Sequence, residues 1–270
     1  MSSVYKDGHL PNCSTAKPLT LDKRLAIISR HVAPGGRFLD CGCGKGQYVR
    51  PICLRLGLDA FGVEYEQESV DNVQSDEFLS KRISQGDLQN LDYPDGEWDY
   101  ALLNEVLEHV GDDEKVLCEV HRVLKPGGLL FVFSPNRWFP FETHGVTLKM
   151  NGRLIYWLPF VPYVPAKLGQ YLYRADARNY WQGQLRRMLE RAGFTIVERT
   201  FIWPTFEGIS GKLPRVLKPF RHVFRYAGIA LEKTIFLKRF GVSQVFVCRK
   251  GDESAPPGHA RDAVGISNIR

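Results

Sequence analysis

Two glutamates and two histidines in the middle of the chain could bind a metal ion or move a proton. Glu105, Glu108 and His109 stand at positions i, i+3 and i+4, so a helical turn would place them on one face. His144 follows in a loop, nine residues after Pro135. Such a set can hold Mg²⁺, Mn²⁺ or Zn²⁺, which would bind and acidify a hydroxyl group. Without a metal, His109 or His144 would act as a base or contact the substrate, with Glu105 as a further catalytic candidate.

A glycine-rich turn lies earlier in the chain, where an apolar run gives way to a helical pattern. Residues 40–46 read DCGCGKG. Glycine lets the backbone approach a ligand closely, and the start of the following helix offers unpaired amides to an anion. A dinucleotide site of the GxGxxG type would need glycine at position 47, where this chain has Gln47. The turn therefore predicts a ligand with an anionic end.

Two acidic positions follow later apolar runs. Glu64 comes about twenty residues after the turn, where a carboxylate can accept hydrogen bonds from both hydroxyls of a ribose. Asp87 can accept from an adenine amino group while Leu88 packs on the ring. Each acid alone could equally be a solvated loop residue or a helix cap. Three such signals at three strand ends together indicate a nucleoside ligand.

Short apolar runs alternate with helical patterns, which is typical of βαβ units with a parallel sheet. The expected strands are 37–42, 60–64, 82–87, 98–104, 129–134, 194–201 and 243–249. The expected helices are 47–56, 114–124 and 181–192. The pattern predicts a doubly wound α/β domain over 20–249. Residues 137–180, rich in aromatics and proline, are expected to form an inserted lid, 204–240 a basic irregular segment, and 251–270 a disordered tail.

The chain resembles the class I S-adenosylmethionine-dependent methyltransferases over roughly residues 20–135. The resemblance is carried by FLDCGCGKG, GVE, GDL, LNEVLEHV and LKPGGLLFVFSPN. It implies a seven-stranded, mostly parallel, Rossmann-like sheet with an antiparallel last strand, and S-adenosylmethionine as the cofactor. The cofactor-binding residues that it implies are Asp40, Gly42, Gly44, Gly46, Glu64, Asp87, Leu88 and Asn104.

The segment after the fourth strand bears on the methyl acceptor. Nitrogen methyltransferases of nucleic acids carry a [DNS]-P-P-[FYW] tetrad there, whereas this chain reads NEVLEH, which favours an oxygen acceptor. We therefore expect O-methylation of a small-molecule, lipid-linked or glycan hydroxyl. The four residues Glu105, Glu108, His109 and His144 are similar to the Glu-x-x-Glu-His and distal His of small-RNA 3′-terminal 2′-O-methyltransferases, and the first three to ubiquinone-pathway O-methyltransferases. Many metal-free relatives also carry Leu-Glu-His here, so both the cation and the metal-free base stay open.

The charge of the chain, +6, is unevenly distributed. Residues 212–240 carry eight Lys or Arg against the single acid Glu232, interleaved with apolar residues. This basic amphipathic pattern suits peripheral contact with anionic lipid, and the aromatic lid would admit a lipid or quinone tail. The plainer alternative is an apolar core with a solvated basic rim. Nucleic acid is not favoured as a partner, because no RNA-binding module or dense basic tail is present.

Six cysteines without a CxxC pair, together with the lack of a leader at the N-terminus, predict a cytoplasmic protein. The basic segment 212–240 adds the expectation that it is peripheral at a membrane surface. No apolar stretch is long enough to cross a membrane. The alternative functions are a nicotinamide-dependent oxidoreductase, an RNA 2′-O-methyltransferase, and a non-catalytic binding module that keeps the fold. Gln47 opposes the first, and the intact Asp40, Gly42, Gly44 and Glu64 oppose the last.

Overall fold

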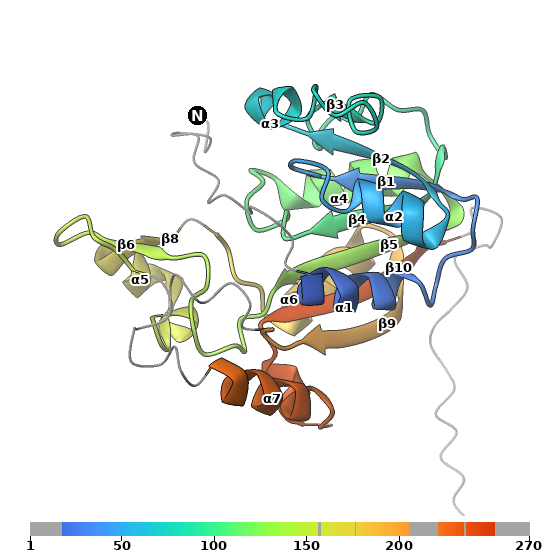
Figure 1. Cartoon of the computed structure of the whole chain (residues 1–270). Helices are drawn as coiled ribbons and strands as arrows, with labels where there is room; N and C mark the ends of the chain where they lie inside the picture. Colours follow the sequence, from blue (N-terminus) through green and yellow to red (C-terminus); the bar gives the residue numbers. More distant parts are fainter. Residues whose placement is uncertain (1–17, 156–157, 176, 206–220, 235, 252–270) are drawn as a thin grey trace, which may run out of the picture.

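The computed structural model describes residues 18–155, 158–175, 177–205, 221–234 and 236–251. A central sheet with helices on both faces forms the main body, and a smaller sheet projects beside it (Figure 1).

The central sheet has seven strands in the order β3-β2-β1-β4-β5-β10-β9. The first five strands in this order pair in parallel, whereas β10 runs antiparallel to both β5 and β9. The strands are β1 (Arg37–Cys41), β2 (Asp59–Glu64), β3 (Ile83–Gln85), β4 (Trp98–Asn104), β5 (Leu124–Pro135), β9 (Phe194–Ile202) and β10 (Ser243–Lys250). The doubly wound α/β fold with an antiparallel last strand is therefore confirmed.

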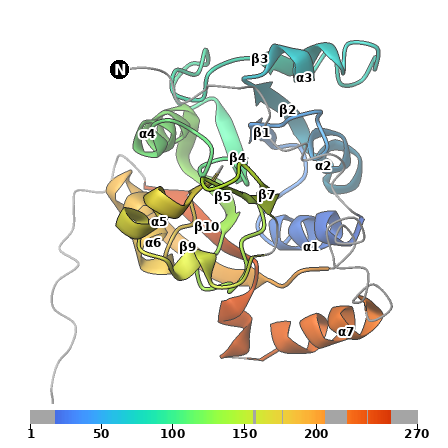
Figure 2. The same ribbon diagram turned by 90° about the vertical axis from the view of Figure 1, so that its left-hand side faces the viewer.

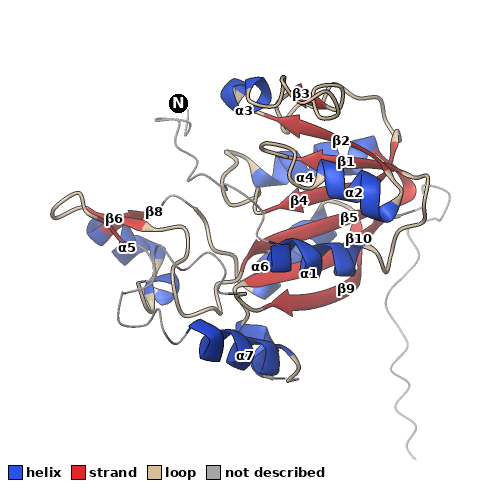
Figure 3. Cartoon of the chain, in the orientation of Figure 1, coloured by secondary structure: helices blue, strands red, loops and turns tan. Residues whose placement is uncertain are grey.

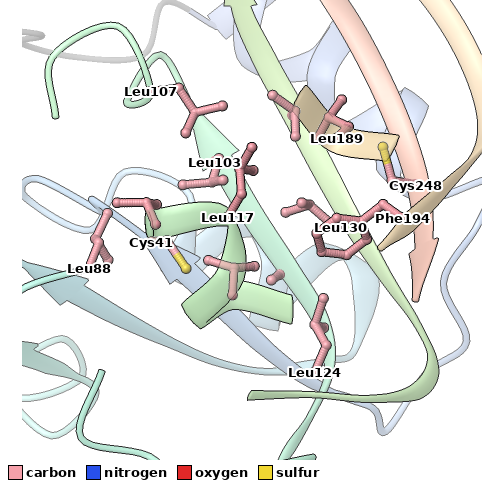
Figure 4. Packing of buried hydrophobic residues seen from close by; sticks show 14 of the residues in the cluster. Cys41, Leu88, Leu103, Leu107, Leu117, Leu124, Leu130, Leu189, Phe194 and Cys248 are labelled. Atoms are coloured by element: carbon pink, nitrogen blue, oxygen red, sulfur yellow. The ribbon is translucent and has the colours of Figure 1, made fainter. Parts of the chain in front are cut away.

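The central sheet separates the hydrophobic core into two clusters, and helices cover each of them. On one face, Leu25 of α1 belongs to the same cluster as Phe131 of β5. On the other face, Leu117 of α4 and Leu189 of α6 belong to the same cluster as Leu130, and Figure 4 shows these side chains. Leu130 and Phe131 are neighbours on one strand, so they point to opposite faces. The flanking helices are α1 (Pro18–Ile28), α2 (Val49–Leu56), α3 (Gln67–Asp71), α4 (Asp113–Val123) and α6 (Gln182–Arg191).

Element boundaries lie close to those expected, with two differences. The fifth strand is expected at 129–134, but β5 begins at Leu124, because Leu124 already pairs with Trp98 of β4. The Lys-Pro-Gly-Gly segment then interrupts the register, with Gly127 at a φ of 74°, and regular pairing resumes at Leu129. Helix α1 was not predicted as an element. Its burial of Leu25 and Ile28 against the sheet explains why it forms there.

The expected lid, residues 137–180, has structure of its own. It contains a three-stranded sheet in the order β7-β6-β8 and a short helix (Figure 3). Both ends are held at the body, since the Arg137 amide donates to the Tyr180 carbonyl at 3.1 Å and the Tyr180 hydroxyl donates to the Leu107 carbonyl at 2.8 Å. The elements are β6 (Val146–Leu148), β7 (Leu154–Ile155), η1 (Val161–Tyr163), α5 (Ala166–Leu172) and β8 (Tyr173–Ala175).

The segment expected to be basic and irregular contains helix α7 (Arg221–Glu232) and the turn η4 (Leu237–Phe240). An ion pair between Lys23 and Glu232 joins α7 to α1. Figure 2 shows α7 in orange at the edge of the body, on the side from which the lid projects. Residues 206–220 and the expected disordered tail beyond Gly251 lie outside the described residues. Among the helices described, none is long and apolar enough to cross a membrane.

Candidate functional site

The turn after β1 has the backbone that close approach to a ligand requires. Gly42 and Gly44 have φ of 75° and 53°, in the left-handed region that favours glycine. A Cβ at Gly44 would meet no atom within 4 Å, so the turn faces open space there. A Cβ at Gly42 would lie 2.7 Å from a methyl carbon of Val106, so a side chain would push the turn into the opposite wall.

Gly46 has a different place from the one predicted. It does not line the cavity beside the turn, although the resemblance placed it among the cofactor-binding glycines. Its φ is 70°, and a Cβ there would lie 2.5 Å from Ile83 and 3.0 Å from Leu79. Glycine is therefore needed at this position so that the turn can pack against the core.

Glu64, at the end of β2, is tied to the glycine turn. Its Oε2 accepts the Gly44 amide at 2.7 Å, and its Oε1 accepts the Glu66 amide at 3.0 Å. The residue is buried and lines the cavity. These two bonds hold the carboxylate at the position where a ribose would meet it.

Asp40, the last acid of β1 before the turn, is almost completely buried. Burial, with a further contribution from the charge of Glu64, raises its pKa to about 8. Its Oδ2 has no hydrogen-bond partner among the described residues. A cationic group of a ligand at this position would stabilise the ionised carboxylate.

One cavity of about 310 Å³ joins the turn to the residues predicted to act on the acceptor. Leu88 is buried in its wall, and Asp87 lies beside it with Oδ1 accepting the Gln89 amide at 2.8 Å. Asn104 also lines the cavity, and its buried Oδ1 has no partner in the described part of the chain. The other lining residues are Asp40, Gly42, Cys43, Gly44, Lys45, Gln47, Tyr48, Glu64, Tyr65, Glu66, Glu105, Val106, His109, Val110, Thr143 and His144.

At the other end of the cavity, three of the four predicted metal ligands converge. Glu108, His109 and His144 each offer a ligand atom, and these atoms all lie within 4.8 Å of one another. The two imidazole rings meet edge to face with centroids 5.4 Å apart. The Glu108 carboxyl is fully buried, and neither of its oxygens accepts a hydrogen bond from a described donor. Its burial and the neighbouring Glu105 raise its pKa well above the usual range.

Glu105, the fourth predicted ligand, is engaged elsewhere. Its Oε1 accepts from the Arg24 guanidinium at 2.5 Å and from the Ser243 hydroxyl at 3.0 Å. Burial raises the pKa of Glu105, but the charges of Arg24 and His144 and the hydrogen bond from Ser243 together lower the pKa below its usual value. Its φ of 56° is uncommon for a residue with a side chain. Glu105 lines the cavity but does not join the cluster of Glu108, His109 and His144.

Two residues that the sequence analysis missed support the site. Glu142 is buried, and its Oε1 accepts the His144 amide at 2.9 Å and lies 3.7 Å from Nδ1 of the same histidine. Asn179 donates to its other oxygen at 2.6 Å. A carboxylate two residues before a candidate histidine is a signal that could have identified Glu142. Arg24 lies in a helix far from the motifs and gave no local signal.

The order of the strands, the antiparallel β10 and a cavity at the glycine turn of β1 define a class I, Rossmann-like methyltransferase fold. Residues 39–132 match the family described as "Methyltransferase domain". Over these residues the chain matches a methyltransferase domain, and the sheet built around them has the class I, Rossmann-like strand order.

Relatives of this domain methylate different atoms. A ubiquinone biosynthesis O-methyltransferase from Methylococcus capsulatus is 30% identical over 136 residues, covering 48% of this chain and 55% of its own length. A sterol 24-C-methyltransferase from Gibberella zeae is 34% identical over 133 residues, covering 45% of this chain and 35% of its own length. Matches to the first curated relatives span between 34% and 55% of those proteins.

The structural comparison supports the same fold over more of the chain. The crystal structure of an S-adenosylmethionine-dependent methyltransferase from Mesorhizobium loti superposes with a TM-score of 0.55 and 19% identity. It covers 85% of this chain and 100% of that one. At this identity the likeness bears on the fold alone.

Proposed function

We propose that this protein transfers a methyl group from S-adenosylmethionine to a hydroxyl of a small-molecule, lipid-linked or glycan acceptor. The observation that carries the proposal is the single cavity that runs from the Gly44 turn and Glu64 to His109 and His144. It brings a nucleoside-binding end and a proton-accepting end into one continuous cavity. Methyl transfer needs such an arrangement, because the acceptor must be aligned with the methyl group and water must be kept out.

The residues of the turn fit the cofactor. Its carboxylate end would meet the backbone amides after β1, its ribose Glu64, and its adenine Asp87 and Leu88. Asp40 and Asn104 each hold a buried oxygen without a described partner, which suits the cationic and donor groups of the methionine end. When bound, S-adenosylmethionine supplies an electrophilic methyl group carried on a sulfonium.

The acceptor end supplies a place for the hydroxyl proton. As the acceptor oxygen takes the methyl group, its proton would pass to His109 or His144. Glu142 lies close to Nδ1 of His144 and also binds its backbone amide, so it would orient the ring and stabilise the protonated form. Glu105, paired with Arg24, would shape this end of the cavity without taking the proton.

A divalent cation is a second feature that we propose for this end, on the strength of one specific observation. The buried carboxyl group of Glu108 accepts no hydrogen bond from a described residue. One of its oxygens and one nitrogen each of His109 and His144 all lie within 4.8 Å of one another, close enough to share one ion. Mg²⁺, Mn²⁺ or Zn²⁺ would satisfy Glu108, His109 and His144 together. Glu142 beside His144 resembles the outer carboxylate that often orients a metal-binding histidine.

We infer a reducing, cytoplasmic setting, in keeping with the five described cysteines, all of which are free. The segment 212–240 would add peripheral contact with a membrane. Val223 and Tyr226 of α7 are exposed, which suits such a contact. The nicotinamide and non-catalytic alternatives are not favoured by the match to a methyltransferase domain or by the complete set of cofactor-site residues. The RNA 2′-O-methyltransferase alternative shares both features, and it is not favoured because the sequence has no dense basic tail.

The test is incubation of the purified protein with methyl-labelled S-adenosylmethionine and separate lipid and aqueous metabolite extracts. We expect label in a product whose methyl group has the carbon chemical shift of a methoxy group. Titration with S-adenosylhomocysteine and with NADH provides the cofactor control, and only the former is expected to bind. Label on carbon or nitrogen would overturn the hydroxyl acceptor. NADH binding in place of S-adenosylhomocysteine would overturn the whole proposal.

A further inference from the structure

Large apolar side chains on the lid stand exposed to solvent. Met150, at the tip of the β6–β7 hairpin, is 94% exposed, and Tyr171 of α5 is 74% exposed. Leu168 and Leu172 of the same helix are more than half exposed. Single exposed apolar residues are normal on a protein surface, but a group of them on one small element marks an interaction site.

These side chains belong to one surface. Leu168, Tyr171 and Leu172 stand at positions i, i+3 and i+4 of α5 and therefore share a face of the helix. The Lys149 amide donates to the Leu172 carbonyl at 3.0 Å, so the hairpin tip that carries Met150 lies beside the end of α5. We call this set, Met150, Leu168, Tyr171 and Leu172, the lid patch.

The exposed charged residues that the structure describes beside the lid patch are basic. Lys149, Arg153 and Arg174 are exposed beside it, and none of them forms an ion pair with a described residue. No Asp or Glu occurs in the sequence between Glu142 and Asp176. A protein partner would be met by charges of both signs at the rim of its interface, whereas lysine and arginine around apolar side chains match an anionic lipid surface.

A second hollow extends this basic character beneath the lid. A cavity of about 530 Å³ is lined by four bases, Arg137, Lys149, Arg174 and Arg178, and by only two acids. Asp113 forms an ion pair with Arg178 at 3.4 Å, and Glu142 accepts from Asn179, so Arg137, Lys149 and Arg174 remain without an ion pair to a described residue. The excess of positive charge suits the phosphate of a lipid headgroup.

We propose that the lid patch and its flanking bases dock the protein on a bilayer that contains anionic phospholipid. The apolar side chains would enter the boundary between headgroups and acyl chains, and the bases would pair with headgroup phosphates. The surface lies on the lid that also supplies His144, two residues before β6. If the proposed methyl transfer holds, a docked lid would present the acceptor end of the cavity to lipid-linked hydroxyls.

The experiment is flotation of the full chain with phosphatidylcholine vesicles and with vesicles rich in phosphatidylglycerol. We expect binding to the anionic vesicles only, weakened by salt because the headgroup contacts are exposed. The double variant Met150→Asp, Leu172→Asp should reduce binding by about tenfold or more, since it removes two apolar side chains from the lipid. Lys149→Ala and Arg174→Ala should each reduce it by about fivefold.

The matched control is Leu54→Asp, because Leu54 of α2 is 70% exposed and lies outside the lid. It should bind vesicles like the unaltered protein. Calorimetry with S-adenosylhomocysteine checks that every variant is folded, and this binding needs no acceptor, so the docking result stands apart from methyl transfer. The proposal is overturned if the unaltered protein does not bind anionic vesicles. It is also overturned if the α7 variant Tyr226→Asp abolishes binding while the lid patch variants do not, or if the lid patch variants change self-association and leave vesicle binding intact.

Discussion

Arg24 of α1 and Glu105 after β4 form a mostly buried ion pair, with Nη2 and Oε1 2.5 Å apart. The pair connects the first helix to the wall of the cavity, and the Ser243 hydroxyl completes it from β10. Glu105 thereby stays ionised, and its carboxylate lies beside the buried carboxyl of Glu108 without belonging to the group formed by Glu108, His109 and His144.

Removal of Arg24 should destabilise the protein, because a buried carboxylate would lose its partner. We expect Arg24→Met to lower the free energy of unfolding by about 3 kcal/mol, measured by urea denaturation. The double variant Arg24→Met, Glu105→Gln should recover part of the loss. As a matched control, Arg55→Met breaks the exposed pair with Asp22 and should cost less than about 1 kcal/mol. A similar loss in both single variants would contradict the buried role of Arg24.

Glu64 should be a main determinant of cofactor affinity. Glu64→Ala removes a charge-assisted contact to the ribose, so S-adenosylhomocysteine should bind with a dissociation constant raised by one to two decades, or about 1.5 to 3 kcal/mol. Calorimetry with the 2′-deoxy analogue separates this effect from disturbance of the Gly44 turn. The substitution should cost less affinity for the analogue than for S-adenosylhomocysteine. Equal losses for both ligands would place the ribose elsewhere.

Asp40 should make the stability of the free protein depend on pH. Its pKa is about 8 in the folded protein, against 3.8 as the ordinary value, so the folded state holds a proton that the unfolded state loses in this interval. Stability should therefore fall as pH rises from about 4 to 8, and Asp40→Asn should lack this contribution. The difference in Tm between the two proteins at several pH values measures it. Equal pH profiles would mean that Asp40 is ionised in the free protein.

The same carboxyl should couple cofactor binding to pH. A cationic methionine end stabilises the ionised form of Asp40, so affinity for S-adenosylhomocysteine should increase between pH 6.5 and pH 8, by at most about tenfold per pH unit. Calorimetry on Asp40→Asn should give weaker binding and a flatter profile. A wild-type affinity that falls over this interval would show that the ligand does not approach Asp40 with positive charge.

Chelation should decide between a cation and a free base at the acceptor end. If Glu108, His109 and His144 share a metal, EDTA should abolish methyl transfer, and added Mg²⁺, Mn²⁺ or Zn²⁺ should restore it. Alanine at any of the three should remove most turnover and leave S-adenosylhomocysteine binding intact. His31→Gln is the control, because His31 pairs with Glu198 on the body and should not affect turnover.

A metal-free site gives the opposite pattern. Activity would survive exhaustive chelation, elemental analysis would find no metal, and one histidine variant would be far worse than the other, as expected of a single base. This outcome would remove the cation from the proposal and leave His109 and His144 as the candidates for the proton.

The sequence by itself determined the sheet and the cofactor end of the cavity. The apolar runs and the residues that follow them are local signals within a few positions, and the parallel order of the strands brings Asp40, Glu64 and Asp87 to one edge of the sheet. It also predicted that His144 would reach His109, since a lid entered directly from β5 starts beside the cavity.

Only the tertiary structure decided which of the predicted residues form the candidate metal site at the acceptor end of the cavity and which have another role. The spacing predicts that Glu105 shares one face of a helical turn with Glu108 and His109, but this segment lies in a loop before α4, where Glu105 has a φ of 56° and pairs with a residue 81 positions away. Gly46 shares the motif with Gly44, yet it faces Leu79 and Ile83 in the core. Spacing along the chain states which residues can share a face. Whether such a residue lines the cavity, pairs with a buried arginine or faces solvent depends on which remote helices and which part of the lid pack against that residue. No local sequence pattern encodes this packing.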